Sequence, residues 1–123
     1  MTEIVVASDV YDRLQRIMAS DPDGFCELYR DYLTDAWRSV ASLRLACEHR
    51  QPQELRSKAH YLKGSSLVLG LRSLAQCCAE IEQLGSTSSF ETASEKLTEV
   101  TELLRAVQME LEQRLGARVI PAV

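Results

Sequence analysis

The most restrictive feature of this sequence is the spacing of its apolar residues, which recur in alternating steps of three and four over most of the chain. That spacing places apolar side chains on one face of an α-helix. No segment of useful length alternates apolar and polar residues with a period of two, so we expect no β-sheet. The chain is therefore predicted to be all-α, with each helix burying one stripe against its neighbours.

The first half of the chain predicts two helices. Ser8 or Asp9 can cap a short leading helix. Asp21 followed by Pro22 is a typical helix start, and the second helix is predicted to run from there to about Glu48. Its apolar stripe consists of Phe25, Tyr29, Tyr32 or Leu33, Ala36, Val40, Leu43 and Cys47.

Three more helices follow. Pro52 begins the third, and Gly70 ends or bends it. The fourth stops at Gly85, the stretch STSSF is expected to be loop, and Gly116 closes the last helix. Two capping boxes could start that last helix, formed by Ser88 with Glu91 or by Thr92 with Glu95. Short connections make sequential helices antiparallel, so we expect an antiparallel up-down four-helix bundle with a short additional N-terminal helix.

The length of 123 residues suits one domain. We expect a single helical domain over 1–123, with its bundle core at about 22–115 and an unassigned tail at 117–123. No apolar run approaches the roughly 20 residues of a membrane span, and the first residues lack the pattern of a secretion signal. A cytoplasmic protein without membrane partners is the expectation.

Cysteine spacing and net charge exclude further classes. The 4 cysteines show no paired C-x-x-C spacing, so reduced thiols are expected rather than disulfides or a metal site. A net charge of −4 argues against nucleic acid as a partner. The charge is uneven, however, because residues 50–72 are strongly basic. Their cations are Arg50, Arg56, Lys58, Lys63 and Arg72, against Glu54 alone.

The stretch AHYLKGSSLVLG, residues 59–70, is unusual within its helix. On a helical projection His60 lies roughly 140° from the centre of the apolar stripe, and Lys63 and Gly64 share its side. Glycine in a helix interior costs about 1 kcal/mol relative to alanine, which calls for an explanation. Either a neighbouring helix approaches closely at Gly64, or a bulky group must reach His60 from outside.

The second explanation has a chemical counterpart. A neutral imidazole is a good nucleophile near pH 7 and can accept a phosphoryl group, while the ammonium of Lys63 offsets the charge of the phosphoryl oxygens. A metal site would need further ligands, and the E-x-x-H pairs of di-iron bundles are absent. The spacing of His60, Lys63 and Gly64 therefore suits a histidine that is phosphorylated.

AHYLKGSSLVLG followed by LRSLAQCCAEIEQLG resembles the histidine-containing phosphotransfer domain family. The family pattern runs A-H-x-L-K-G-S-S/A-x-x-x-G and then L-x-x-x-C-x-x-[I/L]-E. Its S-S form is similar to the free-standing phosphotransfer proteins of fungal and plant relays. The resemblance covers these two segments closely and, through the helix pattern, most of the chain.

The resemblance implies a phosphocarrier of a multistep phosphorelay, not an enzyme with its own ATP site. His60 would accept a phosphoryl group from the aspartate of one receiver domain, that of a hybrid sensor histidine kinase, and pass it to the receiver aspartate of a response regulator. Lys63 would steady the phosphoryl group and Gly64 would give access to it. The chain would need no cofactor of its own, because Mg²⁺ would be held by the partner receiver domain.

Two further expectations stand beside the resemblance. If the third and fourth helices reverse near residue 71, Glu82 lies level with His60 and could orient its imidazole. Fungal members similar to this chain have glutamine there, whereas many bacterial members have glutamate, and a solvated helical acid is the alternative for Glu82. Receiver domains of this class carry an acidic cluster that the basic segment would attract. The docking candidates are Arg56, Leu67, Ile17 and Met18.

Two other functions remain open at this point. The first is a helical adaptor that docks receiver domains without being phosphorylated, which the intact His60, Lys63 and Gly64 disfavour. The second is a kinase with its own ATP site, but the chain has no Gly-rich nucleotide loop and no room for a catalytic domain.

Overall fold

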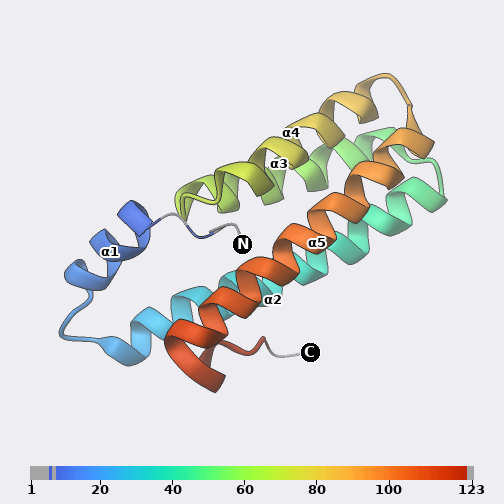
Figure 1. The fold of residues 1–123 in the computed structure, drawn as a ribbon. Coiled ribbons are helices and arrows are strands. Elements are labelled where there is room, and N and C mark those ends of the chain that lie inside the picture. Colours follow the sequence, from blue (N-terminus) through green and yellow to red (C-terminus); the bar gives the residue numbers. More distant parts are fainter. Residues whose placement is uncertain (1–5, 7, 122–123) are drawn as a thin grey trace, which may run out of the picture.

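The computed structural model describes residue 6 and residues 8–121, and in this part of the chain it contains helices and no strands (Figure 1). The elements are α1 (Ser8–Ile17), α2 (Pro22–Glu48), α3 (Pro52–Val68), α4 (Arg72–Ser86), α5 (Phe90–Leu115) and a terminal 3₁₀ helix, η1 (Gly116–Val119). The predicted all-α class is confirmed.

The four long helices form an antiparallel bundle. α3 packs on α4, α4 on α5, α5 on α2, and α2 on α3, so each long helix has two neighbours. Figure 1 shows that α2 and α5 run side by side past the end of the shorter α3–α4 hairpin, where α1 lies. α1 packs on α2. This is the up-down arrangement that the short connections predicted.

The predicted apolar stripes form the core. On α5 the apolar residues that recur in steps of three and four are all almost completely buried, and they are Leu97, Val100, Leu104, Val107 and Leu111. Tyr29, Leu33 and Leu43 of α2 are also inaccessible to solvent. One position of the α2 stripe was wrong: Cys47 is only half-buried, and Ala46 takes the core position at the end of α2.

Several helix ends follow the predicted signals. The side chain of Asp21 caps α2, because its Oδ1 accepts a hydrogen bond of 3.0 Å from the backbone N–H of Gly24. Gly70 has a φ of 72° between α3 and α4, a left-handed conformation that favours glycine. α1 begins at Ser8, so the position that would cap it lies outside the described residues.

The start of α5 differs from the prediction. The helix begins at Phe90, its N-cap is Ser89, and no side chain caps it, so neither predicted capping box forms. Ser88 has a φ of 53°, and the hydroxyl groups of Thr87 and Ser89 bond each other at 2.7 Å. Phe90, expected in the loop, is buried under the guanidinium group of Arg50. Burial of this ring sets where the helix begins.

Part of the unassigned tail belongs to the bundle. Residues Gly116–Val119 form η1, which packs on α2 and α5 and places Val119 in the core. Gly116 has a φ of 78° and allows the sharp turn out of α5. The last two residues of the predicted tail, 122–123, lie outside the described part of the chain.

The cysteines are free thiols, two of them in the core, Cys26 and Cys78, and two half-buried, Cys47 and Cys77. Burial raises the pKa of the Cys78 thiol to about 12. Within the described ranges no three His, Cys, Asp or Glu side chains are grouped so that they could hold a metal ion. No helix in those ranges has the length and apolar character needed to cross a membrane.

Candidate functional site

His60 projects from the outward face of α3, with 68% of its side chain exposed. Its helical neighbours Ala59 and Leu62 are buried and fix which face of α3 points to solvent. One turn further on, a Cβ atom added to Gly64 would meet no atom within 4 Å. Close approach of another helix therefore does not explain this glycine, and the surface beside His60 is open.

The α3–α4 hairpin brings Glu82 opposite His60. The two positions lie equally far from Leu71, which is buried at the reversal. Oε2 of Glu82 lies 3.1 Å from Nδ1 of His60, and Oε1 accepts a hydrogen bond of 2.9 Å from Nζ of Lys63. Both oxygens of one carboxylate thus bind side chains of α3.

The electrostatics of this group determine which ring nitrogen is protonated. The hydrogen bond from Lys63 is the main cause that lowers the pKa of Glu82, and His60 adds to it. Glu82 is therefore a carboxylate at neutral pH and can only accept hydrogen bonds. Nδ1 of His60 must carry the proton that it shares with Glu82. In the neutral ring Nε2 then holds the free lone pair and is the nucleophilic atom.

A buried hydrogen bond fixes α3 against α2 behind the site. The hydroxyl groups of Tyr32 and Ser66 lie 2.8 Å apart, and Ser66 is completely buried. Burial raises the pKa of Tyr32, so the phenol stays protonated. The sequence motif contains this serine, but its partner on α2 could not be deduced from spacing along α3.

Arg56 lies one turn before His60 and runs across α4. A Cβ atom at Gly85 would stand 2.7 Å from Cγ of Arg56 and 3.5 Å from the backbone oxygen of Pro52. Gly85 lies inside α4 and is buried, so it allows α3 and α4 to approach closely. Sequence reasoning treated this glycine as a helix stop and missed its packing role.

Ion pairs engage much of the basic segment. Arg50 binds Glu91 of α5 at 2.9 Å, and Arg72 lies 3.4 Å from Asp9 of α1. Together with the bond between Lys63 and Glu82, these contacts offset three of its five cations. In the described part of the chain, Arg56 and Lys58 make no ion pair. The positive surface beside His60 is therefore smaller than the sequence count indicates.

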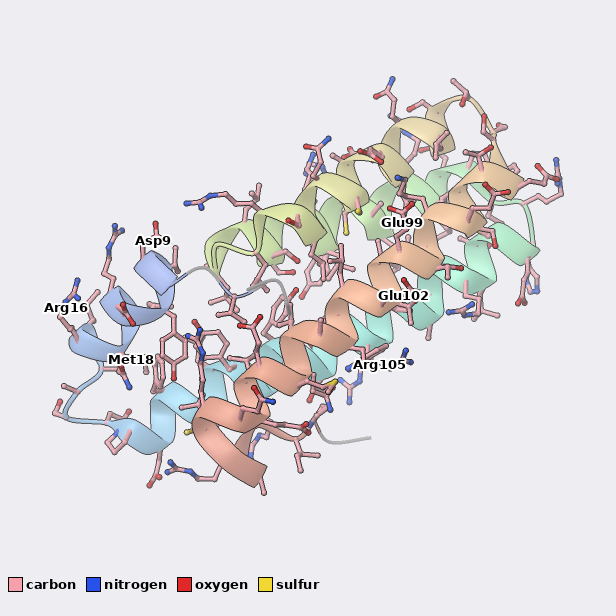
Figure 2. All side chains as sticks on the ribbon, viewed as in Figure 1. Asp9, Arg16, Met18, Glu99, Glu102 and Arg105 are labelled. Carbon is pink, nitrogen blue, oxygen red and sulfur yellow. The ribbon has the colours of Figure 1, made fainter. Side chains whose placement is uncertain are left out.

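The apolar docking candidates differ in solvent exposure and in their position relative to His60. Leu67 is 53% exposed on the His60 side of α3, and the sequence analysis missed Tyr61 and Val68, which are 55% and 74% exposed on the same helix. Both residues are apolar and lie outside the buried stripe of the third helix, and this signal could have revealed them. Ile17, the last residue of α1, is 70% exposed, so its role in docking stays a prediction. Met18, which follows α1, is half-buried against the core and offers less apolar surface than Ile17 (Figure 2).

Comparison with known proteins identifies the family. Residues 27–115 match the family described as Hpt domain. Multistep phosphorelay regulator 1 of Schizosaccharomyces pombe (strain 972 / ATCC 24843) is 33% identical over 86 residues. That match covers 69% of this chain but 29% of the relative, so the chain spans less than a third of its length. The chain belongs to the Hpt domain family.

A solved structure has the same fold. The crystal structure of histidine-containing phosphotransfer protein B from Pseudomonas aeruginosa PAO1 superposes with a TM-score of 0.83 and is 23% identical. The superposition covers 93% of this chain and 96% of that one. At this identity the likeness establishes the helical bundle, and the chemistry must be argued from the side chains.

Proposed function

We propose that this chain is a histidine phosphotransfer protein of a multistep phosphorelay, with His60 as the phosphorylated residue. The observation that carries the proposal is the exposed imidazole with Nδ1 bound to Glu82 beside an open Gly64. Membership of the Hpt family and the likeness to a phosphorelay regulator support the same assignment.

In the proposed reaction, Nε2 of His60 attacks the phosphorus of an aspartyl phosphate. An N–P bond forms, the acyl phosphate P–O bond breaks, and the aspartate leaves as a carboxylate. The proton on Nδ1 stays in its hydrogen bond to Glu82, which lowers the free energy of the developing positive ring. The second transfer reverses these steps onto the aspartate of another receiver domain.

Lys63 is proposed to hold the phosphoryl group. Its ammonium belongs to the same hydrogen-bonded group as His60 through Glu82. A doubly charged phosphoryl group on Nε2 would compete for the hydrogen bond that Lys63 now gives to Glu82. Gly64 would leave room for the phosphoryl oxygens and for the incoming partner.

The proposed partners are the receiver domains of a hybrid sensor histidine kinase and of a response regulator, which would supply the Mg²⁺ ion. Arg56 and the exposed Leu67 are the proposed docking residues of α3, and the exposed Tyr61 and Val68 are added to them. Such a chain would be a phosphocarrier rather than an enzyme. It would act in the cytoplasm together with these partners.

The test is intact-mass measurement after incubation with phosphoramidate, and separately with a phosphorylated receiver domain and Mg²⁺. We expect one acid-labile phosphoryl increment in the wild type and none in His60→Gln. Helicity and melting of the variant should be nearly unchanged, because the ring lies outside the core. An absence of phosphorylation by both donors, with receiver binding retained, would instead make the chain a helical adaptor.

A further inference from the structure

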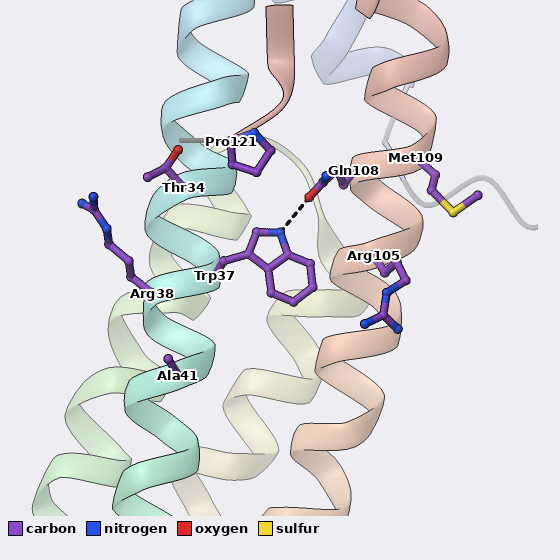
Figure 3. Close-up of a pocket in the computed structure, with 8 residues that line it drawn as sticks. All are labelled: Thr34, Trp37, Arg38, Ala41, Arg105, Gln108, Met109 and Pro121. Atoms are coloured by element: carbon purple, nitrogen blue, oxygen red, sulfur yellow. Dashed lines mark hydrogen bonds between the residues drawn. The ribbon is translucent and has the colours of Figure 1, made fainter. Parts of the chain in front are cut away.

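A groove lies between α2 and α5, the two long helices that do not contribute His60, Lys63, Gly64 or Glu82 (Figure 3). Its volume is about 480 Å³, and most of its lining is apolar. This volume falls within the range of small-molecule sites in proteins. The phosphotransfer function proposed above makes no use of the groove.

The centre of the groove is the indole ring of Trp37, the single tryptophan of the chain. Figure 3 shows the ring projecting from α2 toward α5. Its Nε1 donates a hydrogen bond of 2.7 Å to Oε1 of Gln108, and Nε2 of Gln108 donates to Glu112 at 3.3 Å. Because the polar edge of the indole is satisfied within the protein, the rest of the ring offers an apolar surface held in one orientation.

Further apolar groups extend this surface. Pro121 follows η1 along the edge of the groove, and Ala41 lines it from α2. Met109 of α5 is 55% exposed at the rim, where Figure 3 shows its side chain directed away from Trp37. The groove is thus suited to a flat or branched apolar body.

Arg105 gives the groove its positive charge from α5. Arg38 also lines the groove from α2, but Figure 3 shows its guanidinium group directed away from Trp37 and α5. Within the described part of the chain Arg105 has no ion pair or hydrogen-bond partner for its guanidinium group, and the nearest ion-pair contact of Arg38 is Asp35 at 4.0 Å. A guanidinium group binds a carboxylate through two parallel hydrogen bonds. A cation beside an apolar groove is complementary to a ligand with one anionic end.

We propose that the groove between α2 and α5 binds a small organic carboxylate with an aromatic or branched apolar body. The body packs on the ring of Trp37 beside Pro121, and the carboxylate binds the guanidinium group of Arg105. The site is separate from the phosphotransfer site, because its lining comes from other helices.

The experiment uses the full chain labelled with ¹⁵N, in which Trp37 gives one indole N–H signal. The probes are 2-naphthoate and its uncharged analogue 2-naphthalenemethanol. We expect 2-naphthoate to shift the indole signal saturably and to bind about tenfold more tightly than the alcohol, since a charge-assisted pair adds roughly that factor. Arg105→Gln should reduce the affinity for 2-naphthoate to that for the alcohol. Arg13→Gln, which removes an exposed arginine of α1, is the matched control and should change neither affinity.

Three results would overturn the proposal. The first is the absence of a saturable shift of the indole signal with 2-naphthoate. The second is equal affinity for the two probes, which would show that Arg105 does not recognise the anion. The third is a shift of the same signals with protein concentration alone, which would assign the groove to a second copy of the chain. Backbone spectra of each variant show that the bundle is intact in every comparison.

Discussion

The ammonium group of Lys63 lies 2.9 Å from Oε1 of Glu82, across the interface between α3 and α4. Both side chains are about three-quarters shielded from solvent, with exposed fractions of 27% and 28%. The cation proposed to hold a phosphoryl group is therefore engaged by a carboxylate while His60 is unmodified. Phosphorylation would place two anionic groups in competition for one ammonium.

Replacing Lys63 by alanine should slow transfer from a phosphorylated receiver to His60 by roughly 10- to 100-fold. A hydrogen bond to a charged group contributes about 1.5–3 kcal/mol, and the bond from Lys63 to the transferring phosphoryl group would be lost in the variant. Rapid-quench transfer kinetics measure the effect. Lys58→Ala is the matched control on the same helix, and equal rates in the two variants would contradict the role of Lys63.

Substitutions of Glu82 should distinguish two effects of this residue on transfer: orientation of the His60 imidazole by a hydrogen bond, and the negative charge of the carboxylate. Glu82→Gln keeps an oxygen that can accept the Nδ1 proton, whereas Glu82→Ala removes it. We expect the alanine variant to transfer about tenfold more slowly than the glutamine variant, as expected for the loss of a hydrogen bond of about 1–1.5 kcal/mol. The ¹⁵N shifts of His60 should show the Nδ1–H tautomer in the wild type and in Glu82→Gln. A tautomer unchanged in Glu82→Ala would exclude an orienting role.

The stability that Glu82 contributes should disappear in acid. Its pKa is lower in the folded chain than the ordinary value of 4.5, chiefly because of Lys63. The folded state therefore binds its proton less readily, and the contribution is present above pH 4.5 and lost as the pH falls below it. The difference in free energy of unfolding between wild type and Glu82→Gln should be at most about 1 kcal/mol at pH 7. Urea denaturation should show that difference shrinking toward pH 3.5, and a difference that grows in acid would refute this assignment.

The two helical glycines of the α3–α4 hairpin should respond oppositely to alanine. Gly64→Ala should raise the free energy of unfolding by about 0.5–1 kcal/mol, because the added Cβ meets nothing and alanine favours the helix. Gly85→Ala should lower it by about 1–3 kcal/mol, since its Cβ meets Arg56 and the backbone of Pro52. Urea denaturation of both variants measures the contrast.

A longer side chain at position 64 should affect transfer rather than folding. Gly64→Gln is expected to leave the bundle stable and to slow phosphotransfer about 100-fold, because the side chain would lie over the turn that presents His60 and displace the partner. A variant that transfers as fast as the wild type would show that the glycine has no role in access.

The buried contact between α2 and α3 should be worth a measurable part of the stability. Tyr32→Phe and Ser66→Ala each leave one buried hydroxyl group without its partner, which costs about 1–3 kcal/mol. The double variant should lose less than the sum of the two single losses, because the second substitution removes the unpaired group. Additive losses would show that the two hydroxyl groups are energetically independent.

The helices and the facing pair could be predicted from sequence because each depends on a short-range regularity. The apolar spacing gave the helix faces, Gly70 gave the reversal, and the reversal placed position 82 opposite position 60. The start of α5 could not be predicted in this way. The capping residues matched the local signal, but burial of Phe90 against other helices decided where the helix began.

Features that depend on contacts between distant segments were also missed. The spacing along one helix cannot show that Gly85 receives Arg56, and the glycine that sequence reasoning suspected of close packing was Gly64 instead. In the same way, a count of charges cannot show which cations are paired. Arg50 and Arg72 find carboxylates on α5 and α1, far away in the sequence.

The packing of Arg56 over Gly85 has a consequence for recognition. Close contact at one end of the hairpin and the buried turn at the other hold α3 and α4 as a single stiff unit, so His60 and Glu82 have little freedom to move apart. The surface that a proposed partner would meet is then already in its binding shape. Association can proceed as rigid-body docking, and complexes with different partners would differ in the partner's loops more than in this bundle.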